Sequence, residues 1–145
     1  MLRRESGLIV NVATVAALHG VPYLAAYGAS KAALVSLSQS LRAELSGTGV
    51  RVMVVYPGYT RTEIFDVEKN VGGARRPRGT YAPPENVAEA VARGIEAGKR
   101  DVFLTARGRL LSILRGSAPF VVERAMRGIA RELRDTAAPS DRPAR

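Results

Sequence analysis

Two residues four apart, Tyr27 and Lys31, form the most suggestive chemical pair in this sequence of 145 residues. On a helix, positions i and i+4 lie on one face, one turn apart. A free phenol holds its proton too tightly for acid/base work near neutral pH, and a nearby ammonium stabilises the phenolate. The pair can therefore act as an acid/base device. Because many helices carry Tyr and Lys at this spacing, the pair alone is weak evidence of catalysis.

Two further polar features follow predicted strands. Thr14 comes directly after a short apolar run, and Pro57-Gly58 follows a second such run. In an open parallel sheet, ligands bind beyond the carboxyl ends of the strands. The hydroxyl of Thr14 and the phenol of Tyr27 could then reach the same carbonyl oxygen. Taken by itself, Thr14 is more often a capping residue at the end of a strand.

The elements that must position these residues alternate between strand and helix. Alternation of this kind indicates right-handed βαβ units and a parallel sheet. We predict an α/β fold of about three strands with flanking helices, in one domain over residues 1–135, followed by a disordered tail over 136–145. The predicted strands are 8–13, 50–55 and 101–104; the predicted helices are 25–45, 83–98 and 108–134, the last in two pieces. Residues 59–82 are predicted to form a long loop, with a short helix near 63–68.

The order and spacing of these motifs resemble the short-chain dehydrogenase/reductase family over residues 7–63. The run from Gly7 to Thr14 resembles the strand that ends at that family's catalytic hydroxyl. Tyr27 to Lys31 matches the Tyr-x-x-x-Lys signature in the common form Tyr-x-Ala-Ser-Lys, and Pro57-Gly58 followed by Thr62 matches a Pro-Gly motif with a downstream Thr. Residues 80–104 resemble the family more weakly. The resemblance implies the C-terminal half of a Rossmann-type, doubly wound parallel sheet.

The resemblance also implies roles. Tyr27 would be the general acid in reduction and the base in oxidation, and Lys31 would favour its phenolate and bind the nicotinamide ribose. Thr14 would hydrogen-bond the substrate carbonyl, where the family usually has Ser. Pro57, Gly58 and Thr62 would line the nicotinamide end of the cofactor, and the loop at 59–82 would be the substrate lid. The implied activity is hydride transfer between NAD or NADP and a small carbonyl or alcohol, with the choice of cofactor and the substrate left open.

The family's Gly-rich phosphate-binding turn is missing from the sequence. Gly47-Thr48-Gly49 precedes a predicted strand instead of following one, so it cannot serve. Met1 stands just ahead of the first predicted strand, which suggests a truncated gene product, an internal start or a misplaced start codon. Without an N-terminal half, that strand would be an exposed apolar edge. We therefore expect poor dinucleotide binding by this chain alone, and pairing with an N-terminal fragment or with itself as a homo-oligomer.

The composition argues against a disulfide-stabilised protein, a metalloprotein and a membrane-spanning protein. The sequence has no Cys and one His, His19, so neither a disulfide framework nor a metal site is expected. No apolar run is long enough to span a membrane, and a cytoplasmic location is the default expectation. His19 itself is expected to be a surface or loop residue, and Asn11 to have a structural role.

The net charge of +9 comes mainly from arginines in residues 75–145. We favour solvated surface or composition bias as its explanation over nucleic-acid binding. An apolar stripe predicts core or dimer packing: Leu110, Leu114, Val121, Ala125 and Ile129. The arginines nearby leave peripheral contact with anionic lipid open. Two alternatives to an enzyme therefore remain: an inactive remnant that acts as a binding partner, and a basic protein that binds membrane surfaces or nucleic acid.

Overall fold

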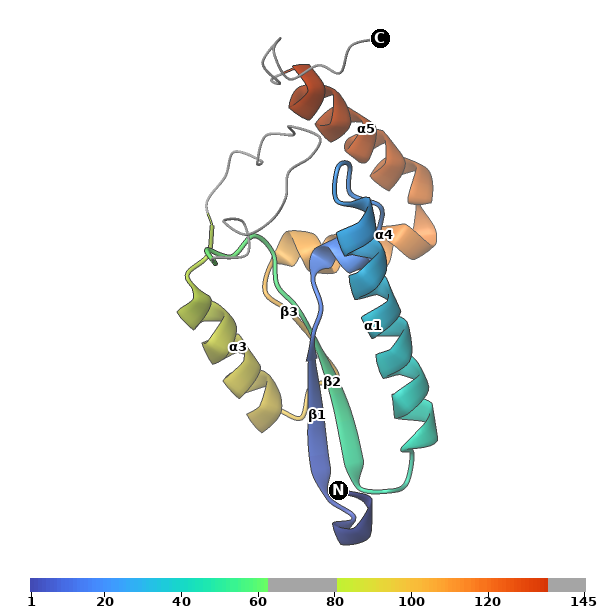
Figure 1. Ribbon diagram of the computed structural model, residues 1–145, viewed down its shortest axis with the longest axis vertical. Helices are drawn as coiled ribbons and strands as arrows, with labels where there is room; N and C mark the ends of the chain where they lie inside the picture. Colours follow the sequence, from blue (N-terminus) through green and yellow to red (C-terminus); the bar gives the residue numbers. More distant parts are fainter. Residues whose placement is uncertain (63–80, 136–145) are drawn as a thin grey trace.

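The computed structural model describes residues 1–62 and 81–135 and shows a parallel sheet between helices (Figure 1). The three strands, in the order β1-β2-β3, are β1 (Gly7–Val12), β2 (Val50–Tyr56) and β3 (Asp101–Phe103). The helices are α1 (Ala25–Glu44), α3 (Pro84–Glu96), α4 (Ala106–Ser117) and α5 (Pro119–Asp135), with short 3₁₀ turns η1 (Leu2–Arg4) and η2 (Val15–Ala17). The predicted α/β class and the parallel sheet are confirmed. The short helix expected near 63–68, most of the lid and the tail at 136–145 lie outside the described residues.

β2 is the buried centre of the sheet. It pairs with β1 on one edge and with β3 on the other, and Met53, Val54 and Val55 have no exposed surface. Successive side chains of a strand point to opposite faces. Val54 accordingly packs in the cluster that contains Val35 of α1, while Met53 and Val55 pack in the cluster that includes residues of α3. A strand covered on both faces should be apolar at nearly every position, as this one is.

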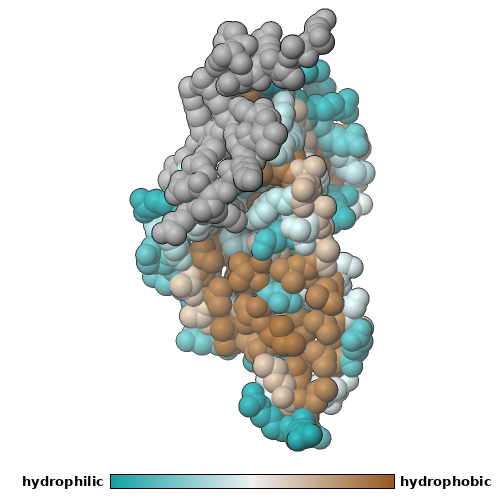
Figure 2. Space-filling view, in the orientation of Figure 1, coloured by the Kyte–Doolittle hydropathy of each residue, from teal (hydrophilic) through white to brown (hydrophobic). Residues whose placement is uncertain are grey.

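β1 pairs with β2 in parallel from Gly7↔Val50 to Val12↔Val55, and it is the edge of the described sheet. Its residues are only half-buried, and Val12 is 47% exposed. The apolar composition of this strand is typical of a buried strand, but no described residue covers its outer edge. The predicted apolar edge is confirmed. Figure 2 shows an extensive apolar surface over the part of the molecule where β1 runs between α3 and α1.

α1 packs on the sheet through small residues near its start and a polar contact at its middle. A Cβ at Gly28 would lie 3.2 Å from the carbonyl oxygen of Ala16, so the first turns of α1 approach η2 closely. Further along, the Nδ2 atom of Asn11 donates a hydrogen bond of 2.9 Å to Oγ of the fully buried Ser38. This contact joins β1 to α1. It agrees with the structural role expected for Asn11.

Arg42 fastens the last turns of α1 to two strands at once. Its Nε donates to the carbonyl oxygen of Val52 at 3.0 Å, and its Nη2 lies 3.1 Å from Oδ1 of Asp101 and also donates to the carbonyl oxygen of Arg100. The guanidinium is well suited to such contacts because its donors form a rigid planar fork. The Arg42 side chain is only 12% exposed. These contacts of Arg42 therefore hold the C-terminal end of α1 against the sheet.

The turn between α1 and β2 depends on glycine. Gly49 has a φ of +74°, and a Cβ there would lie 1.8 Å from the carbonyl oxygen of Glu5. No other residue fits both the left-handed conformation and this close approach. The turn thereby sets the start of β2 against the segment that leads into β1.

The predicted division of residues 108–134 into two helices is confirmed, with the break at Ala118. The hydroxyl of Ser117 donates to the carbonyl oxygen of Ile113 within α4. One detail differs from the expected core packing of the apolar stripe: Leu110 and Val121 are exposed, whereas Val122, which is not part of the stripe, is buried. No helix among the described residues is long and apolar enough to cross a membrane.

Shortening Met53 should test the role of β2 as the centre of the fold. Met53→Ala removes a fully buried side chain and leaves a cavity, so we expect the free energy of unfolding to fall by about 2–5 kcal/mol. Leu37→Ala on α1 is the matched control, because Leu37 is 53% exposed and its loss should cost much less. Urea unfolding of the three proteins measures both effects. Equal losses in the two variants would contradict the assignment of the core.

Tyr56 should make stability depend on alkaline pH. Burial raises the pKa of Tyr56 to about 12, and the Asp101 carboxylate adds to the rise through its charge and its hydrogen bond, against the opposing charge of Arg42. An unfolded tyrosine loses its proton near pH 10. The folded state therefore holds this proton more tightly, and the resulting stability is complete below about pH 10 and is lost as the pH rises toward about 12.

The Tyr56→Phe variant isolates this effect. Phe keeps the ring, which stacks on Phe103 with centroids 4.5 Å apart, and removes the ionisable hydroxyl. We expect the free energy of unfolding of the variant to fall less steeply than that of the unmodified chain between about pH 10 and 12. Urea unfolding across this range makes the comparison. Parallel pH profiles would show that Tyr56 does not titrate as described.

Candidate functional site

Thr14 joins the carboxyl ends of β1 and β2. Its Oγ1 donates a hydrogen bond of 3.3 Å to the carbonyl oxygen of Pro57 and accepts one of 3.3 Å from the amide of Ala16 at the start of η2. The carbonyl oxygen of Pro57 also accepts the amide of Val15 at 3.0 Å. Thr14 is 8% exposed. Thr14 therefore caps η2, which is the structural alternative that the sequence left open. Its hydroxyl is bonded both to the carbonyl oxygen of Pro57 and to the amide of Ala16.

Lys31 reaches the same edge of the sheet from α1. Its Nζ donates a hydrogen bond of 3.2 Å to the carbonyl oxygen of Val12, the last residue of β1. The ammonium is thus held two residues from Thr14 along the chain. Tyr27 stands one turn earlier on α1 and is half-buried. Contacts therefore place Thr14, Pro57 and Lys31 at the same end of the sheet, with Tyr27 on the helix face of Lys31, one turn earlier.

The two ends of the predicted lid are held together next to this edge. Thr60 and Ala82 form a parallel bridge, in which the amide of Ala82 donates to the carbonyl oxygen of Tyr59 at 2.9 Å and the amide of Arg61 donates to that of Ala82 at 3.0 Å. Thr62 is exposed just before the residues that lie outside the description. No hydrogen bond ties Thr62 to Tyr27 or Lys31 among the described contacts, so its place at the cofactor stays a prediction.

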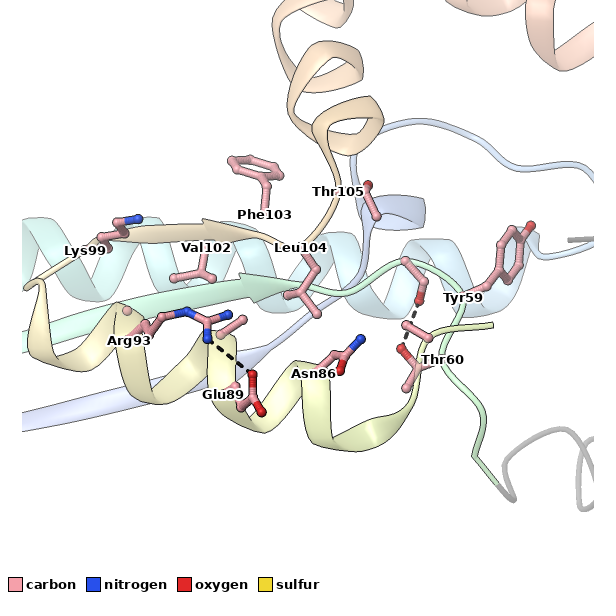
Figure 3. A pocket seen from close by; sticks show the side chains of 14 residues that line it. Tyr59, Thr60, Asn86, Glu89, Arg93, Lys99, Val102, Phe103, Leu104 and Thr105 are labelled. Carbon is pink, nitrogen blue, oxygen red and sulfur yellow. Dashed lines mark hydrogen bonds and ion pairs between the residues drawn. The ribbon is translucent and has the colours of Figure 1, made fainter. Parts of the chain in front are cut away.

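A hollow of about 550 Å³ lies on the other side of β2, between α3 and β3 (Figure 3). Glu89 and Arg93 form an ion pair of 3.2 Å along its wall, and the wall also includes Asn86, Lys99 and Thr60. None of Thr14, Tyr27 and Lys31 lines it. Gly58 is the one predicted site residue in its lining. We take the motif residues as the candidate site, because Thr14 and Lys31 bond the backbone at the carboxyl ends of β2 and β1. No group of His, Cys, Asp or Glu among the described residues could hold a metal ion.

Two loop side chains have surroundings that sequence reasoning does not reveal. The ring of Tyr59 lies 5.6 Å from that of Tyr81, and burial, then the adjacent Tyr81, raises the pKa of Tyr59 against the opposing charge of Arg107. His19 lies in the loop between Thr14 and Tyr27, as expected, but both of its ring nitrogens are buried and have no hydrogen-bond partner among the described residues. Orphaned buried nitrogens of this kind are uncommon. No local pattern reveals them, because the burial of a loop side chain depends on the tertiary fold.

Comparison with known proteins supports a family assignment. The family model described as short chain dehydrogenase matches residues 1–70. Two relatives from Xanthobacter autotrophicus are each 41% identical over 102 residues: 2-(S)-hydroxypropyl-CoM dehydrogenase 3, which aligns with 63% of this chain, and a protein named inactive 2-(S)-hydroxypropyl-CoM dehydrogenase 2, which aligns with 62%. A 3-oxoacyl-(acyl-carrier-protein) reductase from Rickettsia bellii is 33% identical over 109 residues, or 72% of this chain.

Solved structures agree. A short-chain dehydrogenase from Burkholderia cenocepacia in complex with NADP is 25% identical with a TM-score of 0.71, over 86% of this chain and 49% of that one. One from Sphingobium yanoikuyae in complex with NADPH is 26% identical with a TM-score of 0.64, over 94% of this chain and 50% of that one.

The chain spans less than half the length of these curated relatives, 40% to 44%. The matched family model, the relatives and the fold all point the same way. This chain belongs to the short-chain dehydrogenase/reductase family.

Proposed function

We propose that this chain supplies the catalytic segment of an NAD(P)-dependent oxidoreductase that transfers hydride between the nicotinamide and a carbonyl or alcohol substrate. The observation that carries the proposal is the convergence at one edge of the sheet: Lys31 bonds the end of β1, and Thr14 bonds the Pro-Gly segment after β2. Tyr27 lies on the same helix face as Lys31, one turn earlier. Two structural neighbours, which were solved in complex with NADP and NADPH, support the cofactor class.

The residues present fit the nicotinamide end of such a cofactor. A lysine ammonium has three donors, and Lys31 uses one on the carbonyl oxygen of Val12, which leaves donors for the ribose hydroxyls. Pro57 and Gly58 offer little side-chain bulk at the end of β2, so a flat ring can approach the backbone there. The sequence has no Gly-rich turn to receive the pyrophosphate. This segment would therefore hold only the reacting end.

The proposed chemistry assigns each polar group a task. A bound nicotinamide supplies or accepts the hydride. In reduction, Tyr27 gives its hydroxyl proton to the carbonyl oxygen, and the Lys31 ammonium stabilises the phenolate that remains. In oxidation, the phenolate takes the proton from the alcohol. Thr14 turns its hydroxyl from Pro57 toward the substrate oxygen, and the carbonyl oxygen of Pro57 keeps its hydrogen bond from Val15, so no buried acceptor is left without a partner.

We further propose that activity requires polypeptide cover along β1, from an N-terminal segment or from a second copy. β1 is half-exposed and has no partner on its outer edge among the described residues, and the chain spans about half of the solved structures that it matches. A strand edge and an apolar face left in water attract other chains. Cover on this side would also fix the start of α1, which carries Tyr27 and Lys31.

A second candidate function is a binding partner without activity. The free edge of β1 favours it, because such an edge can take up another strand whether or not chemistry follows. Of the two relatives at 41% identity, one is named a dehydrogenase and the other is named inactive. An identity of 41% therefore does not distinguish an active enzyme from an inactive binding partner. The catalytic residues must be tested directly.

The roles of Tyr27 and Lys31 can be tested in a chimaera that joins the N-terminal part of 2-(S)-hydroxypropyl-CoM dehydrogenase 3 ahead of Met1. We expect Tyr27→Phe to lower kcat by about 10²- to 10⁴-fold with little change in NAD(H) or NADP(H) affinity, because only the transferred proton is lost. Lys31→Met should weaken cofactor binding as well. Ser36→Ala, an exposed position on α1, is the control. A chimaera that binds cofactor and turns over equally with Phe at position 27 would refute the proposed acid/base role.

The proposed rotation of the Thr14 hydroxyl from Pro57 toward the substrate oxygen gives a separate prediction. Thr14→Val keeps the shape and removes the hydroxyl, whereas Thr14→Ser keeps the hydroxyl and removes the methyl group. Because Pro57 retains the amide of Val15, we expect both variants of the chimaera to fold, and only the Val variant to lose turnover, by about 10²-fold. Steady-state kinetics and thermal unfolding separate the two effects. A loss of stability in Thr14→Val alone, with kcat unchanged in both variants, would leave Thr14 a cap alone.

A further inference from the structure

The outer surface of α4 and the first turn of α5 expose large apolar side chains. Phe120 is 69% exposed, Ile113 60% and Leu110 54%, and these are three of the four most exposed large apolar side chains among the described residues. Val121, the residue after Phe120, is 43% exposed. Leu110 and Ile113 are three apart on α4, so they share one face. Apolar side chains gathered in this way mark a surface that meets another body.

A stripe of arginines continues from Phe120 along α5. Arg124, Arg127 and Arg131 are four, seven and eleven residues beyond Phe120, which places all of them on its face of the helix. All three are exposed, and they line a shallow hollow with Val121 and Gly128. Arg127 lies 3.6 Å from Glu123, while Arg124 and Arg131 form no ion pair within the described part of the chain. Positive charge and exposed apolar surface thus lie together.

The other face of α5 holds the helix on the protein. Val122 and Leu133 are buried, at 5% and 9% exposure, and α5 packs on α4. The face with Phe120 and the arginines is therefore not needed to attach the helix. It is available for a second contact.

We propose that the surface formed by α4 and α5 docks on a bilayer that contains anionic lipid. Phe120 and Ile113 would enter the boundary between headgroups and acyl chains, and Arg124, Arg127 and Arg131 would contact the lipid phosphates. A helix with an apolar turn and a basic stripe binds a membrane surface through two contributions, the burial of apolar area and the attraction to anionic lipid.

The charge of the surface argues against other occupants. A second copy related by a two-fold axis would place its arginine stripe opposite the arginine stripe of the first copy. The two positive stripes would repel each other, because α5 has no acidic stripe to neutralise them. Nucleic-acid phosphates would satisfy the arginines but leave Phe120 and Ile113 in water. An anionic bilayer satisfies both the charged and the apolar side chains of this surface.

Vesicle binding by the full chain tests the proposal. We would measure co-sedimentation with vesicles of phosphatidylcholine alone and with an equimolar mixture of phosphatidylcholine and phosphatidylglycerol, and in parallel the binding of duplex DNA. Binding should require phosphatidylglycerol and weaken with salt. Exchanging Arg124, Arg127 and Arg131 for Gln should lower the partition coefficient by about 100-fold, and Phe120→Ser by about tenfold.

The control variant exchanges three exposed arginines elsewhere, Arg3, Arg51 and Arg61, for Gln, and removes the same charge. It should bind vesicles nearly as well as the unmodified chain, and circular dichroism should show the same helix content in all variants. Absence of binding to the mixed vesicles by the unmodified chain would overturn the proposal. So would equal losses in the control and the α5 variant, or DNA binding tighter than vesicle binding that Phe120→Ser leaves unchanged.

Discussion

The hydrogen bonds and apolar contacts of β2 hold the rest of the described structure in place. β2 has a strand on each edge and a helix on each face, and Met53, Val54 and Val55 are removed from water entirely. Burial of this extent is the main favourable contribution to folding. Arg42 adds a polar link from α1 to β2 and β3 at the far end of the sheet. The start of α1, and with it the candidate site, is positioned relative to this centre.

At the other end, backbone carbonyl oxygens anchor the side chains of the site. Lys31 is held by Val12, and Thr14 by Pro57, so each anchor is the end of a strand whose position β2 fixes. The site therefore follows from the register of β1 on β2 together with the close approach of Gly28 to η2. What the described residues do not supply is cover for the outer edge of β1. The proposal that activity requires further polypeptide rests on this uncovered edge.

Much of this arrangement is readable from local patterns. Apolar runs and helical periodicity placed each strand and helix within a few residues, and the Tyr-x-x-x-Lys and Pro-Gly spacings placed Lys31, Thr14 and Pro57 on one edge. Local patterns failed where burial depends on distant partners. β1 has the composition of a buried strand, but among the described residues it has a neighbouring strand on one side only. The link from Arg42 to Asp101 joins residues far apart in sequence.

The engagement of the Thr14 hydroxyl and the burial of His19 likewise depend on how loops fold back onto the sheet. The sequence favoured packing for the apolar stripe on α4 and α5, yet Leu110 and Val121 are exposed. A spacing of three or four residues shows that side chains share one helix face, but it does not show whether another element packs on that face. The catalytic roles of Tyr27, Lys31 and Thr14 rest on chemistry and resemblance, since contacts position these residues without showing a reaction.

Native-state hydrogen exchange of the dilute chain tests most directly the claim that β2 is the covered centre and β1 an uncovered edge. Amides of Val52 to Val55 should exchange only with global unfolding, while those amides of β1 that point away from β2 should exchange with little protection. Protection of the outward β1 amides should appear only when an N-terminal segment or a second copy pairs with the strand. Strong protection of these amides in the dilute monomer would show that the edge is already covered, and would contradict the account.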